Sequence, residues 1–234
     1  MHLNTELLFK KYALPYFKDG MKVLEIGGIG ETIFFKTVNN PNIIWHTLDI
    51  NLENADNIFH GNHIISNKEY EYPFENDTYD IVVSGNVIEH VKKIWIWTKE
   101  LNRIIKPNGF IITINPVSWP FHLAPIDCWR IYPDGAKALF EDAKFTILHS
   151  TYESLELEYF GYSSRYLYHP GFIVGDSSIA NFSPENFSKG INYKISFTNK
   201  IRIFYNKLLM NLPIVRRMMI PVRVSFDTIT IAKK

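Results

Sequence analysis

Short apolar runs bounded by glycine and other turn residues divide most of the chain into regular segments. Runs of roughly four to eight apolar residues are typical of strands that are buried on both faces of a parallel sheet. Patterns typical of helices alternate with these runs, which favours an α/β protein with helices on both faces of a mostly parallel sheet. The expected strands are residues 21–26, 43–50, 80–84, 110–115, 145–150 and 225–232.

The clearest helical pattern lies between the third and fourth of these strands. The apolar residues of this pattern are spaced by three or four positions, so they share one helical face. They are Ile94, Trp97, Leu101, Ile104 and Ile105. The sequence Lys106-Pro107-Asn108-Gly109 then ends the helix, because proline cannot continue it and Asn-Gly favours a turn. The other expected helices are residues 6–14, closed by Pro15, and residues 32–38 and 134–143.

Residues 155–224 interrupt the alternation of strands and helices. A stretch of 70 residues between two expected strands is too long for an ordinary connecting loop. We therefore expect a core formed by residues 1–154 and 225–234, with 155–224 as an insertion. The insertion is predicted to act as a lid, as an acceptor-binding element or as an oligomer contact, for example in a homodimer.

Composition narrows the class of protein. Apolar residues make up 46% and charged residues 21%, which is ordinary for a globular protein and argues against a disordered chain. The single cysteine, Cys128, excludes an intramolecular disulfide and a structural zinc site built from several thiolates. Because we find neither a signal-peptide pattern nor a window of 18 apolar residues, we expect a cytoplasmic protein.

The net charge of +1 conceals an uneven distribution. Residues 194–234 contain nine Lys or Arg and one acid, Asp227, whereas the rest of the chain is acidic overall. A basic segment can contact an anionic partner such as a phosphate, a nucleic acid or a membrane surface, or it can be a solvated face. No known nucleic-acid recognition module occurs in the sequence, so we expect no nucleic-acid partner.

A strand followed by a glycine-rich turn is the first candidate binding motif. The sequence Glu25-Ile26-Gly27-Gly28-Ile29-Gly30 spans this turn. Glycine lets the backbone turn sharply and approach a ligand, and the following helix offers free N–H groups. Asp49 ends the second strand, where an acid can accept two hydrogen bonds from a ribose diol. The pair indicates an adenosine-containing ligand; a tight structural turn and a helix-capping aspartate are the alternatives.

Three further blocks carry a family resemblance. They are residues 72–84 (YPFENDTYDIVVS), 86–91 (NVIEHV) and 100–110 (ELNRIIKPNGF). Together with the glycine-rich turn and Asp49, they resemble the class I S-adenosylmethionine-dependent methyltransferases of the small-molecule type, in family order and spacing. The resemblance implies a Rossmann-like fold with a seven-stranded sheet, and S-adenosylmethionine as the cofactor.

The resemblance also implies roles for individual residues. Asp49 and the adjacent Ile50 would lie at the ribose, with the adenine position near residues 67–69. Residues 84–86 would line the methionine part of the cofactor. The expected cofactor-binding residues are Glu25, Gly27, Gly28, Asp49, Ile50, Ser84, Gly85 and Asn86.

The glycine-rich turn departs from the family pattern of acid-x-Gly-x-Gly-x-Gly. Ile29 and Glu31 stand where the second and third glycines are expected. The side chain of Ile29 could crowd the cofactor. The carboxylate of Glu31 would disfavour a phosphate group, which argues against NAD as the ligand.

Candidate acceptor-side residues follow the third and fourth strands. His90 comes after the third strand, beside the expected methyl group, and histidine is suited to act as a general base for an alcohol. Its alternative is a helix-capping or packing role. Residues 115–135 resemble a block found in methyltransferases encoded among bacterial surface-polysaccharide genes. No adjacent pair of acids accompanies these residues, so no metal site is predicted.

The residue types in this block suit a sugar or phosphorylated acceptor. Aromatic rings can stack on a sugar, a histidine or aspartate can accept a proton, and arginine can hold a phosphate. The alternative is that Asp127 and Arg130 pair with each other and that the tryptophans are core residues. The expected catalytic residues are His90, His122 and Asp127, and the expected acceptor-binding residues are Trp119, Trp129, Arg130 and Tyr132.

These observations predict an O-methyltransferase that acts on a sugar, a nucleotide-sugar or a phosphorylated precursor of a bacterial surface glycan, such as capsule or lipopolysaccharide. Residues 200–223 mix basic and apolar side chains, which leaves open a peripheral membrane contact and a lipid or quinone acceptor. The altered glycine-rich turn leaves open a catalytically inactive binding protein with the same fold.

Overall fold

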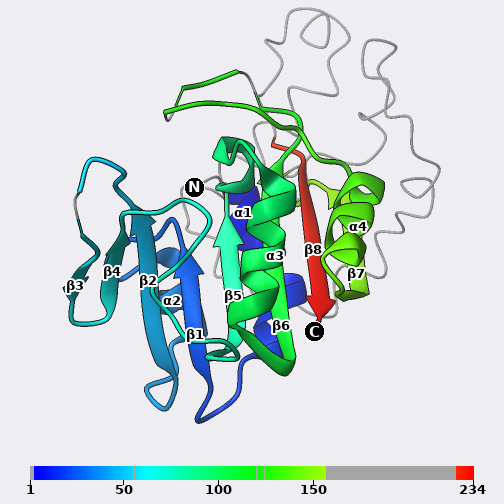
Figure 1. Cartoon of the computed structure of the whole chain (residues 1–234). Coiled ribbons are helices and arrows are strands. Elements are labelled where there is room, and N and C mark those ends of the chain that lie inside the picture. Colours follow the sequence, from blue (N-terminus) through cyan, green and yellow to red (C-terminus); the bar gives the residue numbers. More distant parts are fainter. Residues whose placement is uncertain (1–2, 55, 120, 124, 157–224) are drawn as a thin grey trace, which may run out of the picture. The chain divides into compact units, whose positions relative to one another are not determined.

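A mixed sheet lies at the centre of the part of the chain that the structure describes. The computed structural model describes residues 3–54, 56–119, 121–123, 125–156 and 225–234. The strands are β1 (Lys22–Ile26), β2 (Ile44–Ile50), β3 (Ile58–His60), β4 (His63–Ser66), β5 (Tyr79–Gly85), β6 (Ile105–Pro116), β7 (Thr146–Glu153) and β8 (Asp227–Lys233). Their order is β3-β4-β2-β1-β5-β6-β8-β7. The strands from β4 to β6 in this order are parallel, and β3 and β8 are antiparallel to their neighbours (Figure 1).

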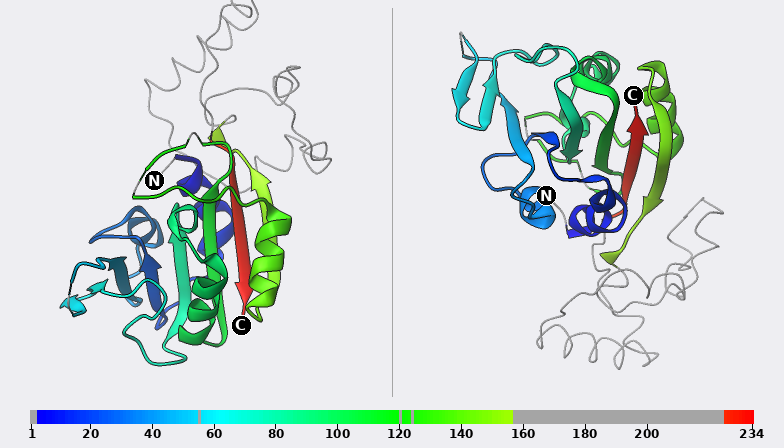
Figure 2. Two further views of the ribbon diagram at one scale, coloured as in Figure 1. Left: turned by 45° about the horizontal axis from the view of Figure 1, so that its top comes forward. Right: turned by 90° about the horizontal axis from the view of Figure 1, so that it is seen from below.

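Helices cover both faces of the sheet. In Figures 1 and 2, α3 and α4 lie on one face, and α1 and α2 lie on the other. The helices are α1 (Leu3–Leu8), α2 (Ile33–Val38), α3 (Ile94–Ile104) and α4 (Pro133–Asp142), with a π-helical turn η1 (Phe9–Ala13) and 3₁₀ turns η2 (Leu14–Tyr16) and η3 (Ile88–His90). The predicted α/β class, with a mostly parallel sheet between helices, is confirmed.

The described sheet has eight strands, one more than the expected seven. β3 and β4 form a hairpin in which Ile58 pairs with Ile65, and the turn contains Gly61 with a φ of +59°. β4 also pairs in parallel with β2, so β3 becomes an additional antiparallel edge strand. These strands are only three and four residues long and include histidine and serine, so no apolar run marks them in the sequence.

The first helix differs from its predicted range of residues 6–14. α1 begins at Leu3, continues as η1 and passes into η2, which contains Pro15 near its start. Proline fits the first turn of a helix because the N–H that it lacks would have no intrahelical partner there. Pro15 therefore accompanies a change of helix type rather than the end of the helical segment.

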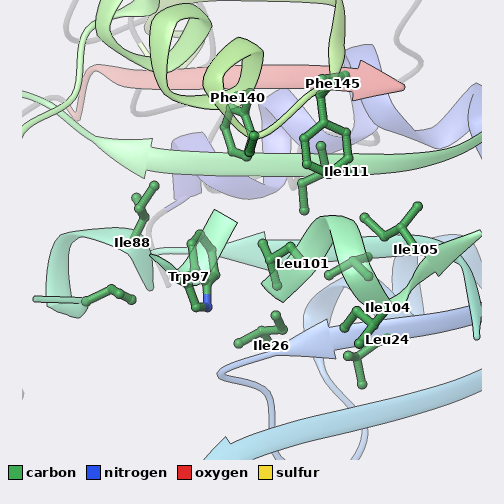
Figure 3. Packing of buried hydrophobic residues seen from close by; sticks show 14 of the residues in the cluster. Leu24, Ile26, Ile88, Trp97, Leu101, Ile104, Ile105, Ile111, Phe140 and Phe145 are labelled. Carbon is green, nitrogen blue, oxygen red and sulfur yellow. The ribbon is translucent and has the colours of Figure 1, made fainter. Parts of the chain in front are cut away.

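The apolar face predicted for α3 is buried against the sheet. Trp97, Leu101 and Ile104 are fully buried in the same cluster as Leu24 of β1 (Figure 3). The Trp97 indole N–H donates a hydrogen bond to the hydroxyl of Tyr72 at 2.8 Å, so its polar atom is satisfied inside the core. This packing fixes α3 against β1, β5 and β6, whose ends carry the candidate site.

A buried carboxylate ties β1 to β2 and to the start of α2. Glu25 accepts hydrogen bonds from Thr32 Oγ1 at 2.5 Å and from Trp45 Nε1 at 3.1 Å. Thr32 is also the N-cap of α2, where its Oγ1 accepts the N–H of Phe35. Burial raises the pKa of Glu25 to about 7, and the two hydrogen bonds partly oppose this increase. Glu25 therefore supports the loop between β1 and α2.

The chain divides into two compact units. One contains the sheet and comprises Met1–Glu153 with Ser225–Lys234; the other is Ser154–Val224. Almost all of the second unit lies outside the described residues, as does most of the basic segment. The roles suggested for residues 155–224 therefore stay predictions. Among the described residues, no helix is long and apolar enough to cross a membrane.

We expect Leu101→Ala to lower the free energy of unfolding by about 3 kcal/mol, because it removes buried methyl groups and leaves a cavity. The matched control on the same helix is Lys99→Ala, because Lys99 is exposed and lies 3.4 Å from an equally exposed Asp142. Its effect should stay within about 0.5 kcal/mol. Urea denaturation of both variants measures the difference. Equal effects would contradict the position of Leu101 in the core.

Glu25→Gln tests the raised pKa of the buried carboxyl. The folded state holds the Glu25 proton up to about pH 7, whereas the unfolded chain releases it near pH 4.5. Because the folded state binds this proton more tightly, Glu25 adds to the free energy of unfolding at low pH. This contribution is fully present below about pH 4.5 and is lost as the pH rises through 7.

Glutamine keeps an acceptor oxygen but cannot ionise, so the stability of wild type relative to Glu25→Gln should fall by roughly 3 kcal/mol between pH 4.5 and pH 8. Urea denaturation without cofactor at both pH values measures this change. If the difference in unfolding free energy between wild type and Glu25→Gln is the same at both pH values, the pKa of Glu25 is not raised.

Candidate active site

The carboxyl ends of β1, β2, β5 and β6 meet at one edge of the sheet, the upper edge in Figure 1. Open α/β sheets bind ligands outside this edge, because the loops after parallel strands gather there. The residues predicted to bind the cofactor all lie in the last two positions of these strands or directly after them. They are Glu25, Gly27 and Gly28 at β1, Asp49 and Ile50 at β2, and Ser84, Gly85 and Asn86 at β5.

Two glycines of the loop after β1 are required by the packing of the chain itself. Gly27 has a φ of +78°, and a Cβ there would lie 2.4 Å from Cγ2 of Val87. A Cβ on Gly28 would lie 2.8 Å from Cγ2 of Thr32 and 3.1 Å from the Glu25 carboxyl. The side chain of Ile29 is instead 70% exposed. Contacts within the protein therefore explain why Gly27 and Gly28 are glycines, independently of any ligand.

Asp49 and Ile50 end β2 next to β4. One carboxylate oxygen of Asp49 accepts the N–H of Ile50 at 2.8 Å. In the register of the sheet, Ile50 pairs with Ser66, so Asn67 follows β4 at the same edge. The unpredicted strand β4 thus brings the expected adenine position, residues 67–69, beside the expected ribose position.

Asn86 follows β5 in an unusual backbone conformation. Its φ is +57°, which asparagine tolerates better than most residues. Its N–H donates to the carbonyl of Ile114 at 2.9 Å, and its Oδ1 accepts the hydroxyl of Thr5 at 2.9 Å. Its Nδ2 is buried and has no hydrogen-bond acceptor among the described residues. Sequence reasoning missed Thr5, since no local signal links α1 to the end of β5.

Glu89 is the second residue that sequence reasoning missed, although it adjoins His90. Its carboxylate lies in η3 with only 1% of the residue exposed, and neither oxygen has a hydrogen-bond partner among the described residues. Burial raises the pKa of Glu89 to about 7, and the positive charge of Arg130 partly opposes this increase. Buried acids with raised pKa values are typical of functional sites.

His90 and His122 lie beside this carboxylate. His90 Nδ1 is hydrogen-bonded to the carbonyl of Ile126, and His90 Nε2 lies 3.8 Å from Glu89 Oε1. Because a carbonyl only accepts, Nδ1 donates this bond, so the lone pair of the neutral ring lies on Nε2. The rings of His90 and His122 are 5.0 Å apart. We refer to Glu89, His90 and His122 as the acceptor-side cluster.

Asp127 and Arg130 form a bidentate ion pair, with contacts of 2.5 and 2.6 Å. Asp127 Oδ2 also accepts the backbone N–H of His122 at 2.8 Å. The Arg130 guanidinium holds the pKa of Asp127 well below its usual range, which makes Asp127 a poor proton acceptor. The structure shows the internal ion pair that one of the two interpretations predicted, and acceptor binding by Arg130 stays a prediction.

The aromatic residues of the segment after β6 differ in their surroundings. The Trp129 indole N–H donates to the carbonyl of Val91 at 2.8 Å, and the side chain packs against the core, as the alternative for this tryptophan predicted. Trp119 is half-buried, and Tyr132 is 57% exposed. Phe121, which was not predicted, is 73% exposed. The rings of Tyr132 and Phe121 are therefore accessible, and acceptor binding by Tyr132 stays a prediction.

Comparisons with known proteins bear on the family and the fold of the chain. A family model described as a methyltransferase domain matches residues 28–113, which run from the glycine-rich turn into β6. A search of the curated proteins finds no match.

Solved structures share the fold at low sequence identity. A SAM-dependent methyltransferase from Archaeoglobus fulgidus gives a TM-score of 0.54 at 17% identity, over 98% of this chain and 92% of that one. Phosphoethanolamine N-methyltransferase 2 from Haemonchus contortus, in complex with S-adenosyl-L-methionine, gives 0.50 at 14% identity, over 99% of this chain and 52% of that one. Such identities establish the fold alone. Residues 28–113 thus match a methyltransferase domain, and the chain shares its fold with SAM-dependent methyltransferases.

Proposed function

We propose that this methyltransferase acts on a hydroxyl oxygen of a sugar, a nucleotide-sugar or a phosphorylated precursor of a bacterial surface glycan. The observation that carries the proposal is the acceptor-side cluster, in which one atom from each of the three side chains lies within 4.8 Å of the others. A hydroxyl has to lose its proton to become a methyl ether, and a histidine beside a buried carboxylate suits that task.

The residues at the carboxyl edge fit S-adenosylmethionine, which supplies a methyl group bound to a positively charged sulfur. The buried Nδ2 of Asn86 lacks a described acceptor and suits the carboxylate of the cofactor. The carboxylate of Asp49 suits the ribose diol. Together these residues would orient the cofactor relative to the acceptor, which supplies much of the rate enhancement.

His90 is proposed to take the proton from the acceptor hydroxyl. Its hydrogen bond to the Ile126 carbonyl keeps one proton on Nδ1, so Nε2 is the basic atom. Glu89 Oε1, 3.8 Å from Nε2, would stabilise the positive charge that forms on the ring. Asp127 would serve this step indirectly, because it accepts the N–H of His122 and thereby positions the segment that carries that histidine.

The sugar part of the proposal rests on the segment after β6. The exposed rings of Phe121 and Tyr132 can stack on the apolar face of a sugar. The resemblance of residues 115–135 to methyltransferases encoded among surface-polysaccharide genes supports a glycan precursor. Because Asp127 occupies the fork of Arg130, a phosphate on the acceptor would be held by other residues.

Asp49→Ala should weaken binding of S-adenosylmethionine by about ten-fold or more, because it removes charge-assisted hydrogen bonds to the ribose. Isothermal titration calorimetry with S-adenosylmethionine and S-adenosylhomocysteine measures the affinity. The matched control is Asp19→Ala, which removes an exposed aspartate just before β1. Asp19 precedes the amino end of β1, away from the predicted cofactor site. The affinity of the Asp19→Ala variant for S-adenosylmethionine should therefore equal that of wild type. If Asp49→Ala binds as tightly as Asp19→Ala, the ribose contact is wrong.

The acceptor is tested with S-adenosylmethionine that carries a ¹³C-labelled methyl group. We expect a methyl ether on a nucleotide-sugar or sugar phosphate, detected by the carbon chemical shift of the product. The His90→Ala variant should lose about 100-fold or more in turnover and keep its cofactor affinity. Phosphoethanolamine serves as the amine comparison. Labelling of the amine alone would overturn the proposal of an oxygen acceptor.

A further inference from the structure

Glu89 is a buried carboxylate whose oxygens have no side-chain hydrogen-bond donor among the described residues. The residue is 1% exposed, and neither oxygen has a partner among the described residues. The guanidinium of Arg130 is held in a bidentate pair by Asp127. An ionised carboxylate without hydrogen bonds is costly to bury unless it is paired with a cation or coordinates a metal. A positive group bound at Glu89 would remove this cost for the ionised form.

The two neighbouring histidines are oriented in the way that metal ligands usually are. His90 Nδ1 is bonded to the carbonyl of Ile126, and His122 Nδ1 lies 3.2 Å from Asp127 Oδ2. A histidine that donates one ring N–H to a carbonyl or carboxylate presents the lone pair of its other nitrogen, and metal-bound histidines almost always have such a partner. The hydrogen bond of His90 thus favours the tautomer with a lone pair on Nε2, and the nearby Asp127 carboxylate favours a proton on Nδ1 of His122.

We propose that Glu89, His90 and His122 bind a divalent first-row transition-metal ion, with Zn²⁺ as the expected occupant. Their ligand atoms lie within 4.8 Å of one another. Ligands about 2.0–2.2 Å from a tetrahedral zinc ion are roughly 3.3 Å apart, so binding needs only a short inward movement of the side chains. Two imidazoles and one carboxylate form a ligand set of catalytic zinc sites, which keep a fourth position open. Mg²⁺ fits less well because it prefers oxygen ligands.

The ion would take over the task of activating the hydroxyl that is proposed above for His90. Its catalytic role rests on the proposed O-methyl transfer, although its binding does not. The open position would take the acceptor hydroxyl. A bound ion lowers the pKa of water to about 7, and it would act likewise on the hydroxyl, whose proton passes to solvent. The alkoxide oxygen then bonds to the methyl carbon, and the electron pair of the carbon–sulfur bond returns to sulfur to give S-adenosylhomocysteine. In this form of the site, His90 and His122 are ligands rather than bases.

Metal binding is measured directly on the full chain after dialysis against EDTA. Zn²⁺ is titrated by calorimetry, and Co²⁺ is added as an optical probe, because its visible absorption reports tetrahedral coordination. We expect one ion per chain and a loss of affinity of about 100-fold or more in both Glu89→Gln and His122→Ala. The control is His60→Ala, which removes an exposed histidine of β3 and should bind as wild type does.

S-adenosylmethionine is titrated into the same samples. Loss of ion binding with retained cofactor affinity and an unchanged melting temperature supports the proposal, because the variants are then folded. The absence of stoichiometric binding by wild type, or equal affinity in wild type and both cluster variants, overturns it. Full turnover by EDTA-treated enzyme overturns the catalytic role of the ion and leaves the O-methyltransferase proposal intact. Ion binding without any methyl ether product contradicts only that O-methyltransferase proposal.

Discussion

The parallel pairing of β5 with both β1 and β6 is the constraint on which the site depends. Ile26 pairs with Ser84, and Gly85 pairs with Ile114, so the three strands end level with one another. The N–H of Asn86 donates to the Ile114 carbonyl and extends this alignment into the first loop residue. A shift of one residue in the register would turn the side chains of β5 to the opposite face. The backbone ladder therefore determines which residues from distant segments meet at this edge.

Two buried acids at this edge, Glu25 and Glu89, differ in their hydrogen-bond partners, and this difference indicates different roles. Burial raises the pKa of both Glu25 and Glu89 to about 7. The Glu25 carboxylate receives hydrogen bonds from Thr32 and Trp45, so its interactions are complete within the fold. The Glu89 carboxylate has no such donors among the described residues. An unsatisfied buried group needs an explanation, and a site for a ligand supplies one.

Local periodicity made much of the fold predictable, whereas long-range contacts decided the rest. The spacing of Leu101 and its neighbours is visible within one helix, and Asp49 stands out because it ends an apolar strand. The hairpin of β3 and β4 is too short and polar to produce such a signal. Glu89 was missed because its surroundings depend on a distant segment, in which the N–H of Cys128 donates to the Glu89 carbonyl at 2.7 Å. The three-residue spacing of Asp127 and Arg130 is compatible with an ion pair between them and with two separate roles. Only the structure of the folded segment shows that the ion pair forms.

The position of β8 in the sheet affects how the chain folds as it is made. β7 pairs only with β8 in the described sheet, whereas β8 lies between β6 and β7. The roughly 70 residues that separate β7 from β8 take the ribosome about 4–15 s to add at 5–20 residues per second. During that interval β7 has no partner and β6 has an unpaired edge, and unpaired edges promote association between chains. Each nascent chain therefore passes through an interval of seconds in which aggregation competes with completion of the sheet.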